Sequence, residues 1–284
     1  MKKTRWWLCL IPLYIFALLF EVGPIMYMAA LSFATNNAGG FGYEWTLTAD
    51  NYRKMLDPVY LKCFQQSLTL AFTTTVLAIL IGYPFGYFMG KLSKRGKQLM
   101  MFLIMIPFWT SSLIRLYGWQ IILQKKGILN WFLLTLGIIE EPLAILYTYP
   151  AVLIGMLYAL LPFMILAVYS SVDKMDWHLV EAARTLGASQ SKAFFTVTLK
   201  LTMPGLLSGV ILTFVPSMGL FFIADLLGGN KIVLVGSLIQ DMLTRGSNWP
   251  FAAALAVILT VLTTIMIRLY HKLTNAKQLE GLTM

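Results

Sequence analysis

Two carboxylates that interrupt long apolar stretches, Glu21 and Asp225, are the residues best suited to binding chemistry. Asp225 closely follows Phe221 and Phe222, just after a proline and a glycine that favour a broken helix end. A carboxylate beside aromatic faces can replace the water around a desolvated cation. Asp225, Phe221 and Phe222 are therefore candidates to line a path through the membrane, at a place where a cation would meet a carboxylate and aromatic faces together.

Each acid also has a structural interpretation. Asp225 could pair with Lys231 or Arg115 near a membrane interface, although we prefer its place on the substrate path. For Glu21, the path and a structural ion pair remain equally open. Trp109 is a further candidate for the path, but Trp109 and Arg115 also fit an aromatic belt with a snorkelling cation, which is the interpretation we favour for Arg115.

The remaining residues form no pattern for covalent or metal chemistry. His178 and His271 stand apart from any cluster of cysteines or carboxylates. The glycines before Lys91 and Lys97 lack the rest of a phosphate-binding loop. Residues 187–189 faintly resemble a serine nucleophile turn, but no histidine partner lies in an apolar stretch. The sequence therefore predicts no catalytic residue, metal or cofactor, and any ATP and Mg must bind to another chain.

The composition sets the class of protein. Hydrophobic residues make up 58% and charged residues 12% of the 284 residues, which is more apolar than a soluble core requires. The net charge of +10 could suggest nucleic-acid binding. However, the basic residues lie in short clusters between apolar stretches, as they do beside membrane spans.

Six stretches of low charge are long enough to cross a bilayer as helices. They are residues 6–33, 63–90, 98–114 (extended to 119), 142–172, 201–224 and 246–267. The first is too long, and too interrupted by prolines and a glutamate, to be a cleaved signal peptide. Most of the 22 basic residues flank the spans on one side, so the positive-inside rule places both termini in the cytoplasm.

Two further patterns concern packing. Gly82, Gly86 and Gly90 recur every four residues, which lets a neighbouring helix approach closely; a sliding surface during gating is the alternative. Residues 128–136 predict a short interfacial helix on the outer side, anchored by Trp131.

Residues 181–205 form a long polar segment between two apolar stretches. Helix formers predict a short helix from residue 176 to 186, with Gly187 as its C-terminal cap. Ser189 can cap a second helix, and Pro204 marks the expected bend into the next span.

This polar segment resembles the EAA loop of bacterial ABC import permeases. Glu181, Ala182, Ala183 and Gly187 match the loop's pattern in type and spacing, whereas Lys200 stands where the pattern has a proline. In that family the loop forms the coupling helix that docks into a separate ATP-hydrolysing subunit. The resemblance therefore implies this role for the four matching residues, and an amphipathic connector on the membrane surface is the alternative.

A second resemblance spans most of the chain. Four segments look like the matching parts of permeases for spermidine and putrescine: IPFWTSSLIRLYGW (106–119), LDPVY (56–60), LLPFM (160–164) and GLFFIADLLGG (219–229). This implies a polyamine substrate, an extracytoplasmic binding protein, a second permease subunit and a dimer of ATP-binding subunits.

The sequence thus predicts an all-α, polytopic membrane protein with six transmembrane helices and the type I ABC importer permease fold, in a bacterial inner membrane. We divide it into an N-terminal helix with the first outer loop (1–55), the permease core (56–272) with a cytoplasmic coupling loop (173–202), and a cytoplasmic tail (273–284). A permease for another small organic or inorganic ion is the alternative. An ion-coupled secondary carrier is less favoured, because neither an inverted repeat nor several intramembrane charges are evident.

Overall fold

The computed structural model describes the backbone of residues 4–37, 42–229 and 231–282, and the side chains of 11–37, 42–229, 231–269 and 272. The chain divides into two compact units. The first contains residues up to 63 together with 238–265, and the second contains residues 64–237 together with those from 266 onward.

The first unit begins with a continuous helical segment and a small hairpin. It contains α1 (Thr4–Ala17), the π-helical η1 (Leu18–Val22), α2 (Gly23–Leu31), β1 (Thr35–Asn36), β2 (Tyr43–Glu44), α3 (Asp50–Lys54), and parts of α13 (Val235–Thr244) and α14 (Trp249–Leu282). The two strands are antiparallel, with Thr35 opposite Glu44 and Asn36 opposite Tyr43.

A buried asparagine fastens the end of α2 in this unit. The side-chain amide of Asn51 donates hydrogen bonds to the carbonyl oxygens of Ser32 (2.9 Å) and Ala34 (2.8 Å). Leu31 and Ala34 pack against Ala253 of α14. Because buried carbonyls at a helix end need partners, Asn51 stabilises the turn that leads into the hairpin.

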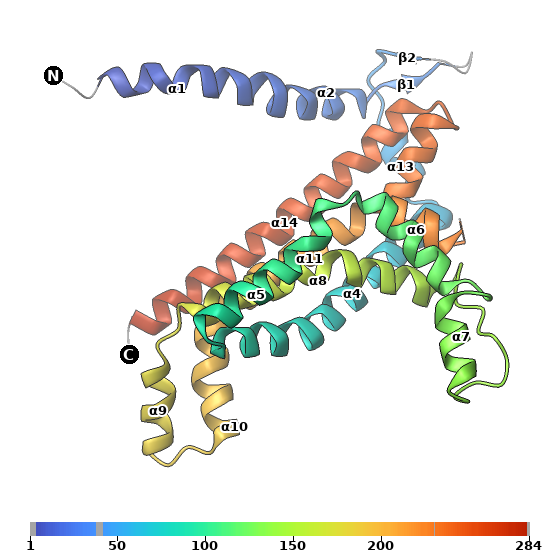
Figure 1. Ribbon diagram of the computed structural model, residues 1–284. Coiled ribbons are helices and arrows are strands. Elements are labelled where there is room, and N and C mark those ends of the chain that lie inside the picture. The colour runs from blue at the N-terminus through green and yellow to red at the C-terminus, as the bar shows by residue number, and fades with distance from the viewer. Residues whose placement is uncertain (1–3, 38–41, 230, 283–284) are drawn as a thin grey trace. The chain divides into compact units, whose positions relative to one another are not determined.

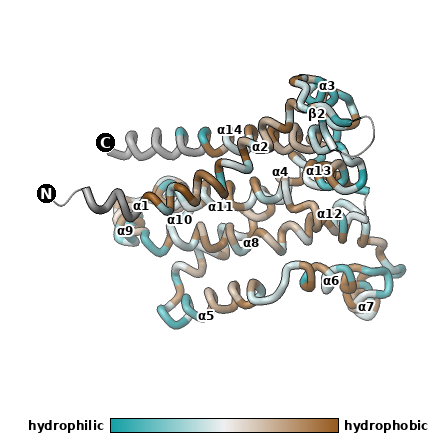
Figure 2. Tube along the Cα trace, turned by 90° about the horizontal axis from the view of Figure 1, so that it is seen from above, coloured by the Kyte–Doolittle hydropathy of each residue, from teal (hydrophilic) through white to brown (hydrophobic). Residues whose placement is uncertain are grey.

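The second unit holds most of the long helices. Its elements are the larger part of α4 (Pro58–Lys91), α5 (Lys94–Met105), the 3-10 turn η2 (Ile106–Trp109), α6 (Ser112–Leu123), α7 (Ile128–Thr135), α8 (Tyr149–Asp173), α9 (Trp177–Thr185), α10 (Gln190–Ala193), the π-helical η3 (Phe194–Thr198), α11 (Leu199–Gly219) and α12 (Phe221–Gly228). Figure 2 shows hydrophilic residues concentrated at the turns and apolar residues along the helices.

Helix α8 packs against α4 along the predicted glycine stripe. A Cβ atom added to Gly82 would lie 2.8 Å from Cγ of Met164, and one added to Gly86 would lie 2.9 Å from the carbonyl oxygen of Ile165. A Cβ on Gly90 would clash with Val172. The three glycines therefore serve close helix packing, as predicted.

Helix α11 packs along the same α8. Gly205 approaches the backbone of α8 at Ala167 so closely that a Cβ atom would lie 2.6 Å from its carbonyl oxygen. The Tyr83 hydroxyl of α4 and the Thr202 hydroxyl of α11 form a buried hydrogen bond of 2.8 Å. The helices α4, α8 and α11 thus form one scaffold.

The third predicted span differs from the expectation. Five helices of the described chain are long and apolar enough to cross a membrane, and there are six if a bent pair counts as one span. That pair, Lys94–Trp109 and Ser112–Thr135, is bent by 93° where a single helix was expected. Pro107 lacks a backbone donor and starts a 3-10 turn, and Thr110 and Ser111 take extended conformations.

Other expectations are confirmed or adjusted at the ends of elements. The predicted break before Phe221 is present, because α11 ends at Gly219 and α12 begins at Phe221. The predicted interfacial helix corresponds to α7, in which Trp131 is exposed. Helix α11 runs on through Pro204, so the departure from regular α-helix lies earlier, in η3. The sequence did not predict α13.

Candidate functional site

The coupling segment, residues 173–202, lies between the ends of α8 and α11 (Figure 1). Helix α9 begins after Asp176, whose Oδ1 accepts a hydrogen bond from the backbone N–H of His178 (3.0 Å). Helix α10 begins after Ser189, whose Oγ accepts from the N–H of Lys192 (3.3 Å). Both N-terminal caps are local, so the sequence itself fixes where the two helices start.

Gly187 ends α9 as predicted. It has a φ of +89°, and a Cβ atom there would meet nothing within 4 Å. The N–H of Gly187 donates to the carbonyl of Arg184, and the N–H of Ala188 donates to that of Ala183, both at 3.0 Å. This is the bonding pattern of a left-handed C-terminal cap, so the glycine is required for its backbone conformation and not for space.

The candidate coupling residues are presented on the surface of α9. Glu181, Ala182 and Gly187 are exposed, and Ala183 is half-buried. Beside them, the side chain of Leu186 is 88% exposed. The exposed part of α9 and its end thus presents a charge, small residues and one apolar side chain.

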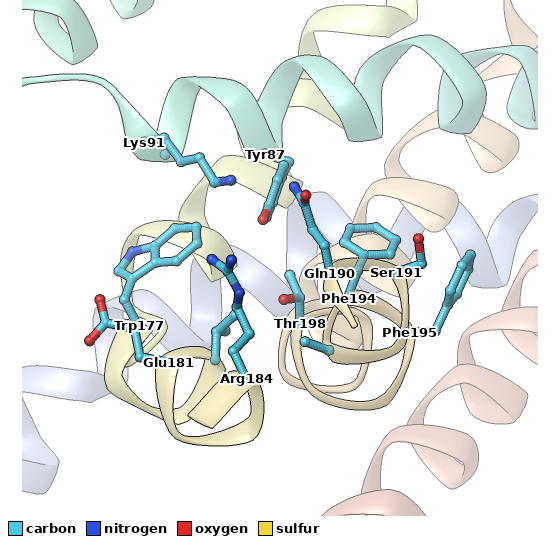
Figure 3. A pocket seen from close by; sticks show the side chains of 13 residues that line it. Tyr87, Lys91, Trp177, Glu181, Arg184, Gln190, Ser191, Phe194, Phe195 and Thr198 are labelled. Atoms are coloured by element: carbon cyan, nitrogen blue, oxygen red, sulfur yellow. The ribbon is translucent and has the colours of Figure 1, made fainter. Parts of the chain in front are cut away.

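An open cavity of about 630 Å³ separates α9 from α10 and the end of α4 (Figure 3). Nζ of Lys91 lies 4.3 Å from the ring centroid of Tyr87 and 5.4 Å from that of Trp177. The two rings are 5.8 Å apart. This cluster joins α4 to the first residue of α9, and Glu181 and Arg184 line the same cavity.

The residues predicted for the substrate path belong to three elements, η1, η2 and α12. Asp225 is half-buried, and its Oδ1 accepts a hydrogen bond from Oγ of Ser237 (3.0 Å). Among the described residues no ion pair to Lys231 or Arg115 is present. The hydrogen-bond partner of Asp225 is thus a neutral hydroxyl, and no cation of the described chain forms an ion pair with it.

Of the aromatic candidates, Phe221 and Phe222 lie together on α12, and Trp109 lies on η2. Phe222 lines a largely apolar cavity of about 330 Å³ together with Arg115. The centroid of Phe221 is 6.1 Å from that of Phe222, with the rings edge to face. Trp109 is 74% exposed at the end of η2 and packs edge-on against Phe102.

Glu21 lies elsewhere, on the first unit. It belongs to η1 and is exposed. A π-helical turn inside an apolar helix often marks a functional position. Among the described residues Glu21 forms no ion pair, and a carboxylate within hydrocarbon is unfavourable unless it finds a partner.

Sequence reasoning missed two aromatic residues beside Arg115. The guanidinium carbon lies 5.6 Å from the ring centroid of Phe108 and 5.9 Å from that of Tyr158. An arginine within a span needs a partner, which was the available indication. Which rings supply it depends on the break between η2 and α6, and the sequence did not predict that break.

Comparison with known proteins identifies the class. Residues 82–277 match the family described as binding-protein-dependent transport system inner membrane component. The chain belongs to this family. It is therefore a multi-pass inner-membrane transport component and not an enzyme, as the sequence predicted.

Similar members of the binding-protein-dependent transport family extend the match over nearly the whole chain. The spermidine/putrescine transport system permease protein PotB of Haemophilus influenzae is 44% identical over 261 residues, which are 91% of each chain. The protein of the same name from Escherichia coli is 42% identical over 254 residues, covering 89% of this chain and 92% of its own.

Solved structures agree on the fold of this family member. A bacterial ABC transporter involved in the import of the acidic polysaccharide alginate superposes with a TM-score of 0.71 at 15% identity, covering 96% of this chain and 95% of that one. The MetNI methionine ABC transporter in an inward-facing conformation gives a TM-score of 0.56 at 16% identity, covering 76% and 95%. These likenesses establish the fold, that of type I ABC importer permeases.

Proposed function

We propose that this chain is a permease subunit of an ATP-driven importer that moves polyamines, such as spermidine and putrescine, from an extracytoplasmic binding protein to the cytoplasm. The observation that carries the proposal is the identity of 42–44% to permeases of spermidine/putrescine systems, over 89–91% of this chain. At that identity and coverage the whole permease core is shared and not only the fold.

The coupling segment is the proposed contact with an ATP-hydrolysing subunit. Glu181, Ala182 and Gly187 are exposed on a helix whose start and end are fixed by local caps, which gives a rigid surface to dock. ATP and Mg would bind on the partner ATPase, two copies of which serve the transporter. A movement of α9 would be transmitted to α4 through the contacts among Lys91, Tyr87 and Trp177.

The proposed orientation has both termini and the coupling segment in the cytoplasm. Helix α8 connects α7 to α9, so α7 and the coupling segment lie at opposite ends of a span. The basic residues are concentrated on the side of the spans that carries α9. By the positive-inside rule, this distribution supports a cytoplasmic location for that side. A second, similar permease subunit would complete the pathway, as the resemblance to polyamine permeases implies.

Uptake by the reconstituted complex tests the proposed function. Proteoliposomes holding both permeases and the ATPase, with the binding protein outside, should accumulate radiolabelled putrescine or spermidine only when ATP is inside. Amino acids, sugars and oxyanions serve as controls. Uptake of one of these instead of a polyamine would overturn the substrate, and uptake without ATP would overturn the coupling.

A further inference from the structure

Two cavities meet at Arg115 in the second unit. The larger, about 330 Å³, lies among η2, α6, α8, α11 and α12, and the smaller, about 180 Å³, lies between η2 and α8. Both are lined by Phe108, Arg115, Tyr158 and Ala159. The arginine side chain and its two aromatic neighbours therefore form the wall between them.

The guanidinium of Arg115 has few polar partners, although the cavities around it are largely apolar. Nη1 donates one hydrogen bond, to the carbonyl oxygen of Thr110 (3.2 Å), and Nε is buried with no hydrogen-bond partner. None of the ion pairs of the described residues includes Arg115. The faces of the Phe108 and Tyr158 rings are the main groups that stabilise its positive charge. A guanidinium stays charged in proteins, so these rings already act as a cation site.

We propose that Phe108 and Tyr158 form an aromatic cage for an alkylammonium group of the transported polycation, and that Arg115 occupies this cage as a stand-in while no substrate is there. The inference rests on the proposed function. Exchanging one monovalent cation for another leaves the charge of the cage unchanged, so no new carboxylate is needed at this point.

The surroundings suit both the exchange and the ligand. Arg115 follows the 93° break, and its one hydrogen bond goes to Thr110 within that break, so a change in the break moves the guanidinium away. The rest of the larger cavity presents apolar walls, including Leu116, Leu160 and Leu212, against which a methylene chain can pack.

The same surroundings disfavour an anion such as a phosphate. A phosphate requires several donors, and besides Arg115 the lining of the larger cavity offers only the hydroxyls of Ser112 and Tyr158. The aromatic faces would also repel it, because their quadrupoles are negative at the face.

Binding of a simple probe to the assembled complex tests the cage. We would measure the dissociation constant of n-butylammonium, with n-butanol as its neutral isostere, on the complex in nanodiscs without the binding protein. Arg115→Gln should bind n-butylammonium about tenfold more tightly, because a cation–π site freed of its own cation is worth roughly 1–2 kcal/mol. Adding Phe108→Leu to Arg115→Gln should remove that gain, and n-butanol binding should not change.

Arg245→Gln is the matched control, since Arg245 is exposed, directly follows α13, and pairs with Asp241 of that helix. If Arg115→Gln does not assemble, Phe108→Leu in the otherwise natural chain keeps the proposal testable, and it should weaken n-butylammonium binding about threefold. Unchanged n-butylammonium binding in both Arg115→Gln and Phe108→Leu would overturn the cage. Loss of inorganic phosphate binding in Arg115→Gln, without a gain for the ammonium, would overturn it in favour of an anion site.

Different outcomes would reject the proposed cage and the proposed substrate class. A complex that takes up no polyamine, but in which Arg115→Gln tightens n-butylammonium binding, would reject the proposed substrate and keep the cage. A complex that takes up polyamines with no change of probe binding in any variant would reject the cage and keep the function.

Discussion

In the described part of the second unit, two cations each lie over a pair of aromatic rings, and their surroundings differ. Lys91 lies over Tyr87 and Trp177 in an open cavity that also contains the charged side chains of Glu181 and Arg184. Water reaches this cation, so its contact with the rings is worth little beyond about 0.5–1 kcal/mol. Its rings come from α4 and α9, and the contact therefore acts as a joint between a span and the coupling segment.

The second cation, Arg115, lies over Phe108 and Tyr158 where the lining is largely apolar. Its Nε atom is buried without a partner. The same type of contact therefore has two uses: where water and acids are present it connects elements, and where they are absent it marks a place for a cation. Four substitutions test this difference.

Gly187→Val should have the largest effect, because it changes the C-terminal end of α9, the helix that the Lys91 contact connects to α4. A β-branched residue at a φ of +89° is strained by roughly 1–2 kcal/mol or more, so the cap should reorganise and uptake should fall about tenfold or further. The measurement is ATP-driven uptake, with assembly checked by co-purification. Gly137→Val is the control, since Gly137 also has a positive φ (+68°) and open space but lies after α7. Equal losses in both variants would contradict a coupling role.

Gly86→Ala tests the scaffold that carries both cation sites. Its Cβ would lie 2.9 Å from the carbonyl oxygen of Ile165, and the resulting overpacking of α4 on α8 should cost about 1–3 kcal/mol. We expect a lower midpoint of thermal unfolding for the purified complex. Gly118→Ala in α6 meets nothing within 4 Å and should leave the midpoint unchanged or raise it slightly. A stable Gly86→Ala complex would mean that α8 moves away from α4 more readily than its packing indicates.

Lys91→Met removes the exposed cation and leaves its rings in place. Because the contact is solvated, uptake per ATP hydrolysed should fall only about two- to fivefold, with ATP hydrolysis itself retained. Lys94→Met, three residues on at the start of α5, is the control. A loss as large as that of Gly187→Val would show that Lys91 does more than join the two elements.

Asp225→Asn should have the smallest effect, since the asparagine can still accept the hydrogen bond from Ser237 while the charge is removed. If Asp225 lies on the path, complex levels stay normal and uptake falls about two- to threefold, more for spermidine than for the shorter putrescine. Reduced assembly with all substrates affected alike would indicate a structural role. Unchanged uptake of both would remove Asp225 from the path.

These regions also show how far sequence reasoning reaches. Gly187 and Ser189 act through hydrogen bonds to residues three positions away, and for this reason their caps were predictable. The glycine stripe was predictable because it repeats with the period of a helix. Each of these depends on local sequence only.

The Arg115 site depends on tertiary structure and was not predicted. Pro107 allows either a kinked or a broken helix, and the extended conformations of Thr110 and Ser111 decide between them. Tyr158, which contacts Arg115, belongs to α8 and is distant from Arg115 in the sequence. The candidates Asp225 and Trp109 were chosen by residue type, and type alone does not tell which surface of a helix faces a cavity.

The uncovered Glu21 in the π-helical turn has a consequence for how cells keep the subunits in balance. An ionised carboxylate near the centre of a bilayer is unfavourable by about 2.5–3.5 kcal/mol, and Glu21 is exposed and forms no ion pair among the described residues. Copies synthesised in excess of whatever covers Glu21 would present an unstable helix to membrane proteases. Degradation of these orphan copies would then match the amount of this chain to that of its assembly partner, without any control of its synthesis.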